Sequence, residues 1–277
     1  MLRIALALFL LPTLAVAQAT SQDRRPSHCI AIADAFPGEA RVWQANWSEP
    51  LEEYTVRITY IDHSMFLIQS EGGIEVVTDY NGFVGDSAFV PDVVTMNNAH
   101  GSHWTANPDP RIPLVLEGWT WEGVPADHHH DMGEMLIRNV TTDIRSPWGD
   151  GRADDGNSIF IFEVAGLCIG HLGHLHHEPS DEQYAAIGRL DVVMAAVDGG
   201  LTLDTPTMLR VLKRLRSSVI LPMHWFGFSS LDAFLTGMSE DYAISRTPGH
   251  SIEVSLRTLP DVPTIHVLDP QFLQYGE

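Results

Sequence analysis

Short apolar runs, separated by turn-forming residues, make up much of the chain after about residue 53. Three of them follow one another closely, at Val56–Ile61, Met65–Gln69 and Ile74–Thr78, and all three are rich in β-branched residues. The breaks between them, Asp62-His63-Ser64 and Glu71-Gly72-Gly73, are typical of turns. The pattern therefore predicts three consecutive strands joined by short turns.

Further apolar runs predict more strands along the chain. They lie at Val93–Met96, Met135–Val140, Ser158–Val164, Leu167–Gly170, Asp191–Val197, Ser218–Leu221, Ile252–Arg257 and Thr264–Leu268. The segment from Asn107 to Pro125 holds several Pro and Trp residues without a clear period, so we expect a long loop there. A second break is expected at Gly149–Gly156, which is rich in Gly and Asp.

Helix signals occur in the second half of the chain. Ser180 and Gln183 have the spacing of a capping box, in which each side chain binds the backbone amide of the other residue. Thr205-Pro206 predicts a second helix, with Thr205 as the cap and Pro206 in the first helical position. A third helix is expected around Ser230–Met238. A strand-rich half followed by strand–helix alternation favours sheets covered by helices.

The N-terminus has the pattern of a secretory signal peptide. An unbroken apolar run from Ile4 to Ala17 follows Arg3 and ends in small residues. A membrane span needs about 20 apolar residues, and Gln18 ends this run early. We therefore expect a periplasmic or secreted protein without membrane insertion after cleavage. The predicted plan is a signal peptide over residues 1–17, an N-terminal extension over 18–53 and one main domain over 54–277.

Charge narrows the class of partner. The formal net charge is -20 at pH 7. Nucleic acids and anionic membrane surfaces bind basic patches, so neither is expected as a partner. We expect a small-molecule substrate, and the sequence does not decide the oligomeric state.

The two cysteines, Cys29 and Cys168, allow two interpretations. In an oxidising compartment such a pair forms a disulfide. The alternative is two separate thiols, with Cys168 buried in a strand. The sequence leaves both open, because a disulfide needs Cα atoms within about 7 Å of each other.

Histidine is the residue type that points most clearly to chemistry, with 14 in the chain. Four groups of them stand at the ends of predicted strands: His63, His100 with His103, His171 with His174, and His224. A single histidine at a strand end is more often structural than a metal ligand. Four separate groups favour a metal site, because neutral imidazole suits Zn²⁺ and similar metals.

In this order the segments resemble the metallo-β-lactamase superfamily, and in particular its lactonase-like branch. VRITYIDHSMFLIQ (Val56–Gln69) resembles the opening hairpin, and Thr78-Asp79 resembles the strand-ending Asp. NAHGSH (Asn98–His103) resembles the signature loop His-x-His-x-Asp-His. HLGH (His171–His174) resembles the strand end that carries Gly-Asp, and LPMH (Leu221–His224) resembles the last ligand strand. The resemblance covers about Tyr54 to Leu268. It implies an αββα sandwich, with two mixed sheets covered by helices, and hydrolysis by a metal-activated water.

Three ligand positions differ from the family pattern. Asn98 replaces the first His of the signature loop, and Ser102 replaces its Asp. His174 stands where the family has an Asp that bridges two metals. Because an imidazole directs one nitrogen at one metal, the differences favour a single ion, most simply Zn²⁺. Its expected ligands are His100, His103, His174 and His224, with His171 kept as the alternative to His174.

The remaining roles follow from the same resemblance. The separate His of the family aligns with Asp143, which we expect to act as a carboxylate ligand or base. Ser102 and Asn98 are expected to bind the water, and His63 to support a ligand or shuttle a proton at the edge of the site. A small ester, lactone, amide or phosphoester is the expected substrate. The alternative is a degenerate, non-catalytic member of the fold that binds metal or a small ligand.

Two further clusters carry weaker signals. Asp127–Asp131 contains three consecutive histidines, which we expect in a loop near the mouth of the site rather than in a metal centre, since neighbouring side chains diverge. Four tryptophans could either line a pocket or pack in the core, and the sequence favours neither interpretation: Trp104, Trp119, Trp121 and Trp148.

Overall fold

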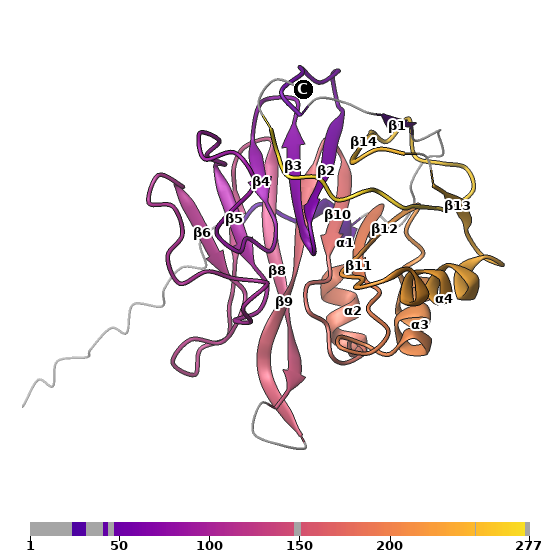
Figure 1. Cartoon of the computed structure of the whole chain (residues 1–277). Coiled ribbons are helices and arrows are strands. Elements are labelled where there is room, and N and C mark those ends of the chain that lie inside the picture. The colour runs from indigo at the N-terminus through magenta and orange to yellow at the C-terminus, as the bar shows by residue number, and fades with distance from the viewer. Residues whose placement is uncertain (1–23, 32–40, 44–46, 147–150, 247, 275–277) are drawn as a thin grey trace, which may run out of the picture.

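The computed structural model describes residues 24–31, 41–43, 47–146, 151–246 and 248–274, and it is built on two sheets packed face to face (Figure 1). The seven-stranded sheet has the order β1 (Arg41–Trp43), β14 (Ser251–Val254), β2 (Val56–Asp62), β3 (Met65–Ser70), β4 (Glu75–Val77), β5 (Val93–Met96) and β6 (Leu114–Glu117). The eight-stranded sheet has the order β13 (Ala243–Ser245), β15 (Thr264–His266), β12 (Val219–Met223), β11 (Val192–Ala196), β10 (Leu167–His171), β9 (Arg152–Val164), β8 (Met135–Arg145) and β7 (His129–Asp131).

Both sheets are mixed. Parallel pairs join β4 to β5 and β5 to β6 in the first sheet, and β10, β11, β12 and β15 in the second. The remaining pairs are antiparallel, apart from β13, which runs parallel to β15. Because parallel neighbouring strands run in the same direction, the loops that follow them leave the sheet at the same edge.

The main core fills the space between the sheets. Strand β9 illustrates how it forms, because successive side chains of a strand point to opposite faces. Phe160 and Phe162 pack into the core between the sheets, whereas Ile159 and Ile161 pack on the other side, beneath the helices. Strands buried on both faces explain why the sequence shows continuous apolar runs there.

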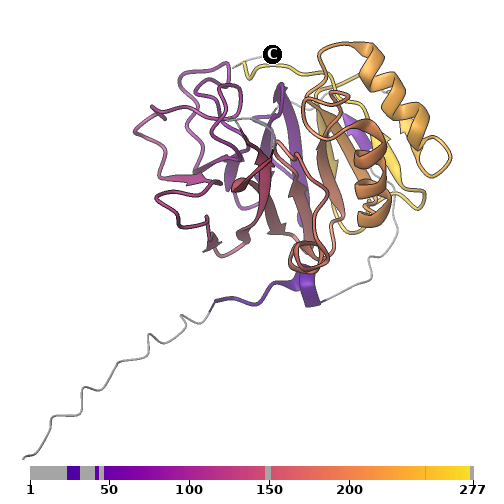
Figure 2. The same ribbon diagram turned by 90° about the horizontal axis from the view of Figure 1, so that it is seen from below.

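Three helices cover the outer face of the eight-stranded sheet: α2 (Asp181–Ile187), α3 (Thr205–Leu215) and α4 (Phe228–Met238). In Figure 2 the orange helices of the second half lie along the outside of this sheet. Among the described residues, loops and not helices cover the outer face of the other sheet, where Met65 and Leu67 pack against Tyr80, Phe89 and Leu273. The predicted α/β sandwich of two mixed sheets is confirmed, with helices on the outer face of one sheet where the resemblance implied helices over both.

The helix caps agree with the sequence prediction in one case and not in the other. Ser180 Oγ accepts the N–H of Gln183, and the Gln183 side chain accepts the N–H of Ser180, so the capping box is confirmed. The predicted cap Thr205 is wrong, since Asp204 caps α3 by accepting the N–H of Thr207 at 3.0 Å. Thr205 is the first residue inside the helix.

Several strands differ from the sequence prediction because pairing, not local pattern, forms them. Leu114–Glu117 lies in the expected loop but pairs with β5, and His129–Asp131 pairs with β8 although its residues are polar. Arg152–Gly156 was expected to break the chain and instead begins β9, opposite the end of β8. Together β8 and β9 form a long hairpin that extends below the sandwich (Figure 1).

The N-terminal segment 24–31 packs against the eight-stranded sheet and its helices. It contains the short helix α1 (His28–Ala31), and Cys29 is joined to Cys168 of β10 with Cα atoms 5.8 Å apart. The disulfide interpretation of the cysteine pair is therefore confirmed. The predicted signal peptide, residues 1–17, lies outside the described residues. Within the described ranges, no helix has the length and apolar character to cross a membrane.

Candidate metal centre

Five histidine side chains meet where several strands of the sandwich end. They come from the β2–β3 turn, the loop after β5, the loop after β10 and the end of β12, and they are His63, His100, His103, His174 and His224. Ring nitrogens of His63, His103 and His224 lie within 4.8 Å of one another, as do those of His100, His103 and His174. His103 therefore joins two groups of three imidazoles, and the four predicted ligands all belong to one cluster.

Two carboxylates support this cluster from behind. Asp79, which follows β4 and is fully buried, forms a short contact with Nδ1 of His103. Asp198, which follows β11, places Oδ2 2.9 Å from Nδ1 of His224. Its Oδ1 accepts the backbone N–H groups of Gly200 and Leu201 at 2.8 and 2.7 Å. Because an ionised carboxylate only accepts hydrogen bonds, each one favours a proton on the Nδ1 that it faces.

The other ring nitrogens of these two histidines face each other. Nε2 of His103 and Nε2 of His224 are 3.2 Å apart. With the protons on Nδ1, both Nε2 atoms carry lone pairs, which repel at this distance unless a proton or a cation lies between them. Two imidazoles on one Zn²⁺, each at about 2.0–2.1 Å from the ion, have their nitrogens at a similar separation. The residues therefore fit a divalent transition metal.

Burial favours the neutral form of two imidazoles of the cluster, His63 and His174. Burial, followed by the neighbouring His224 and His103, lowers the pKa of His63 to about 4. Burial, followed by His103 and His176, lowers the pKa of His174 to about 2. A neutral imidazole keeps a lone pair free for a cation.

The supporting carboxylates remain ionised. Burial alone would raise the pKa of Asp79, but the facing His103 outweighs it and lowers that pKa to about 2. Burial would likewise raise the pKa of Asp198, and hydrogen bonds from His224 and from backbone amides lower it instead. The site thus combines imidazole nitrogen donors with negative charge behind them, which suits a divalent cation.

His174 and His171 differ in what their rings contact. Both ring nitrogens of His171 are engaged, with Nε2 2.7 Å from Ser64 O and Nδ1 within 3.1 Å of the Asn97 side-chain amide and the Gly173 N–H. Nδ1 of His174 is buried without a hydrogen-bond partner among the described residues. The geometry therefore favours His174 over His171 as the donor.

The other predicted site residues are placed differently from one another. Ser102 is half-buried in the loop between His100 and His103, and Asn98 is buried at the start of that loop, where its carbonyl accepts the His100 N–H at 2.7 Å. Asp143 is not brought into the cluster. It lies beside a bulge in the β8–β9 hairpin, where Arg152 lies 3.3 Å from its carboxylate and the Asp155 N–H donates to it at 3.2 Å. Its carboxylate is used within the hairpin.

Asp198 was not predicted from the sequence as a site residue. The signal was present, because Asp198 directly follows a predicted buried strand and precedes Gly199-Gly200, the same strand-end position that singled out the histidines. The role of Asp79 could not be predicted either, since a residue type at a strand end does not show which ring nitrogen it will face.

The weaker clusters do not form a second centre. His129 Nε2 bonds to the carbonyl of Arg25 at 3.0 Å, whereas His128 Nε2 bonds to that of Glu117 at 2.7 Å, so their rings diverge as expected. The expected loop is wrong for residues 129–131, which form β7. His28 lies near Cys29 and Cys168, but the disulfide removes both sulfurs as metal ligands.

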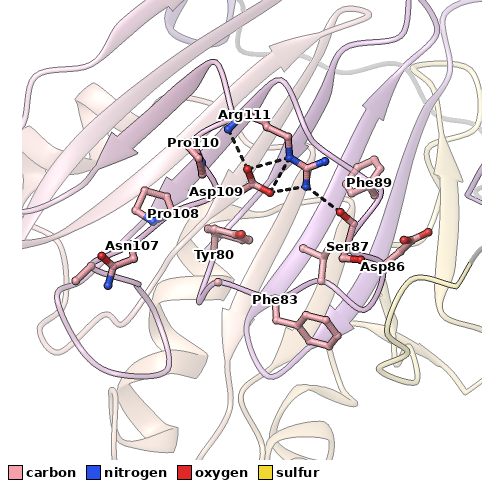
Figure 3. Close-up of a pocket in the computed structure, with 13 residues that line it drawn as sticks. Tyr80, Phe83, Asp86, Ser87, Phe89, Asn107, Pro108, Asp109, Pro110 and Arg111 are labelled. Carbon is pink, nitrogen blue, oxygen red and sulfur yellow. Dashed lines mark hydrogen bonds and ion pairs between the residues drawn. The ribbon is translucent and has the colours of Figure 1, made fainter.

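The tryptophans divide between core and surface. Trp104 and Trp119 make an edge-to-face pair with centroids 5.9 Å apart and pack against the loops that cover the seven-stranded sheet, whereas Trp121 is 66% exposed. Trp148 lies outside the described residues. A separate open cavity has a volume of about 760 Å³ and is lined by Tyr80, Asp109 and Arg111, among others. Figure 3 shows these side chains. None of the five histidines lines this cavity, and its Arg111 is already paired with Asp109 at 2.6 Å.

Comparison with known proteins gives a family and a fold. A model described as a beta-lactamase superfamily domain matches residues 57–224. No curated protein matches the chain. A candidate Zn-dependent hydrolase of the metallo-beta-lactamase superfamily from Thermotoga maritima is 24% identical with a TM-score of 0.57, and the match covers 78% of this chain and 100% of that one.

Two further solved structures share the fold. Igni18, a metallo hydrolase from Ignicoccus hospitalis, is 18% identical with a TM-score of 0.50 over 67% of this chain and 91% of its own. A candidate metal-dependent hydrolase from Parabacteroides distasonis is 11% identical with a TM-score of 0.54 over 86% of this chain and 100% of its own. At these levels of sequence identity, the similarity shows a shared fold and does not assign the site residues of this chain.

Proposed function

Because this chain belongs to the metallo-β-lactamase superfamily, we propose that it is a metal-dependent hydrolase of small substrates. The observation that carries the proposal is the pair of facing Nε2 atoms of His103 and His224, 3.2 Å apart, with a carboxylate at Nδ1 of each. The fold alone would not support it, since one fold hosts many functions.

The ligands in this proposal are His100, His103, His174 and His224, and the metal is one Zn²⁺ or a similar ion. When bound, such an ion supplies Lewis acidity and lowers the pKa of a water to about 7. Asp79 and Asp198 fix the tautomers of His103 and His224 and add negative charge behind the donors. Ser102, between two of the ligands, is the candidate for orienting the attacking water. Asp143 has no role in the proposal, because its contacts lie in the hairpin.

The mouth of the site favours a substrate with an apolar part. Phe226 is 67% exposed, and its ring centroid lies 5.2 Å from that of His224. With a net charge of -20, the protein would also repel a highly anionic substrate. Among esters, lactones, amides and phosphoesters, we therefore propose neutral esters and lactones as the preferred substrates.

The competing function is a non-catalytic protein that binds metal or a small ligand. The replacement of the family's carboxylates by Ser102 and His174 favours it, since these changes remove charge from the usual two-metal array. It predicts the same metal content but no turnover.

Metal content and hydrolysis, measured together, test the proposal. Protein purified without chelator should contain about one equivalent of Zn²⁺ or a similar metal. It should hydrolyse generic esters or lactones, lose activity on dialysis against a chelator and regain it with Zn²⁺. Full metal content without hydrolysis of any ester, lactone, amide or phosphoester would favour the binding protein, and two tightly held equivalents would refute the single-ion site.

Export is part of the proposal and has a separate test. Protein secreted by its host should begin at Gln18, because Ala15-Val16-Ala17 fits a signal-peptidase site. Intact mass spectrometry of the exported protein would detect the loss of residues 1–17, and a full-length chain would contradict it.

A further inference from the structure

The β2–β3 turn carries an imidazole that the ligand set above leaves out. Resting on the proposed function, we propose that His63 is itself a metal ligand and forms a three-histidine face with His103 and His224. One ring nitrogen of each lies within 4.8 Å of the other two. The ring centroid of His63 is 4.0 Å from that of His224 and 5.4 Å from that of His103.

The ring of His63 has a buried nitrogen without a partner. Its Nε2 is inaccessible to solvent and accepts or donates no hydrogen bond among the described residues. A buried polar atom left unpaired is destabilising, so nearly all such atoms in proteins have a partner. A cation shared with His103 and His224 would satisfy it, whereas a proton shuttle at the edge of the site would be expected to reach solvent.

The backbone holds this ring against the cluster. The carbonyl of His63 accepts the N–H of His224 at 2.8 Å and the hydroxyl of Tyr60 at 2.5 Å, so the turn is tied directly to the end of β12. His63 and His224 have φ angles of 48° and 60°, in the left-handed region that favours glycine or asparagine. Such backbone conformations are strained and concentrate at functional sites.

A third contact restricts the orientation of both rings. Phe226 packs with its centroid 5.4 Å from that of His63 and 5.2 Å from that of His224. His103 also belongs to the group with His100 and His174, and one imidazole lone pair binds one ion. A single ion on His103 would therefore be shared by the two groups, and His63 would supply a nitrogen on the side of His224.

The test is the zinc affinity of a His63→Asn variant, measured by competition with a chromophoric chelator. Asparagine tolerates the left-handed turn but offers no imidazole nitrogen. If His63 is a ligand, the affinity falls on the order of 10–100-fold or more, since even indirect contacts to a ligand reach that range. The visible spectrum of the Co²⁺-substituted protein should change at the same time. In a His63→Gly variant, free imidazole should restore affinity.

A matched control is His130→Asn, which removes a partly buried imidazole outside the five-histidine cluster and should leave both readouts unchanged. Thermal unfolding of the metal-free proteins shows whether each variant folds.

An unchanged zinc affinity and Co²⁺ spectrum in folded His63→Asn would overturn the inference. If that variant keeps its metal but loses hydrolysis, His63 is a proton-transfer group and the proposed function stands. If His63→Asn loses metal but the wild-type protein hydrolyses nothing, the inference stands and the proposed function fails.

Discussion

Individual contacts decide which of the clustered histidines can bind a metal. His171 is fully buried, yet its two nitrogens are used by Ser64 and by the Asn97–Gly173 segment. His174, three residues later, is almost as buried and has an unpaired Nδ1. The same residue type in the same strand-end segment thus serves structure at one position and presents a donor at the other.

This contrast gives a prediction for two alanine variants. His174→Ala should lower zinc affinity on the order of 10–100-fold or more, because a donor is lost. His171→Ala should mainly lower the stability of the metal-free protein, by about 1–3 kcal/mol, because the buried carbonyl of Ser64 loses its donor. Chelator competition and urea unfolding measure the two effects. If alanine at 171 abolished metal binding while alanine at 174 left it intact, the assignment would be reversed.

A buried histidine away from the cluster should make the fold sensitive to acid. His266 in β15 is 5% exposed, neither ring nitrogen has a partner in the described structure, and burial lowers its pKa to about 4. In the unfolded chain a histidine titrates near pH 6.5, so between about pH 6.5 and 4 the unfolded state binds the extra proton. The stability that the neutral ring provides is therefore complete above that window and is lost as the pH falls through it.

The measurement is the free energy of unfolding of wild-type and His266→Leu proteins at pH 7 and at pH 4.5, both without metal. The other buried histidines contribute equally to both, so the difference isolates His266. The variant should lose less stability on acidification, by up to about 3 kcal/mol. Identical pH dependence in the two proteins would mean that the ring of His266 does not stay neutral in the fold.

At the scale of the element, strand ends build the site. In the seven-stranded sheet, Asp79 follows β4, and the His100–His103 loop follows the parallel strand β5. In the eight-stranded sheet, strands β10, β11 and β12 are parallel, and they are followed by His174, Asp198 and His224, respectively. The sequence predicted most of these strands and four clustered histidines, because buried strands have continuous apolar runs and the site residues stand directly after them.

What the sequence did not predict depends on contacts between distant segments. Leu114–Glu117 and His129–Asp131 become strands by pairing with β5 and β8. The first is a short apolar run inside a Pro- and Trp-rich segment, and the second is polar. Asp143 was assigned by a weak alignment in a region of variable loops, and its carboxylate faces Arg152 across the hairpin. Asp198 acquires its role only from the ring of His224, which comes 26 residues later in the chain (224 − 198).

Helix α3 offers a test of which residue starts it. Asp204 accepts the N–H of Thr207 at 3.0 Å, whereas Thr205 lies inside the first turn. Asp204→Ala should destabilise the protein by about 1 kcal/mol, and the neighbouring Thr205→Ala should change stability far less. Urea unfolding at neutral pH measures both. A larger effect at Thr205 would restore the cap that the sequence suggested.

At the scale of the whole molecule, one covalent bond fastens the N-terminal segment to the main sheet. Cys29 and Cys168 are 139 residues apart in sequence, and the chain between them includes most of the seven-stranded sheet and strands β7, β8 and β9 of the eight-stranded sheet. Noncovalent contacts support the same docking: Arg189 N–H donates to the Cys29 carbonyl at 2.9 Å, and the buried Glu163 accepts the Ser27 hydroxyl at 2.5 Å. A disulfide that closes so long a loop restricts the unfolded chain strongly.

The double variant Cys29→Ser/Cys168→Ser should therefore be less stable than the oxidised wild type, by about 2–5 kcal/mol. Reduced wild type is the matched control and should unfold at nearly the same urea concentration as the double variant.

Cys168 is the second residue of β10, whereas the histidine cluster lies beyond His171, the last residue of that strand. The zinc affinity of the double variant should therefore be unchanged as long as the protein is folded. Titration of two free thiols in the unreduced, unfolded wild type would contradict the bond. Loss of zinc affinity in the folded double variant would mean that the N-terminal segment also supports the metal centre, because strand β10 is then the path that connects the disulfide to His174.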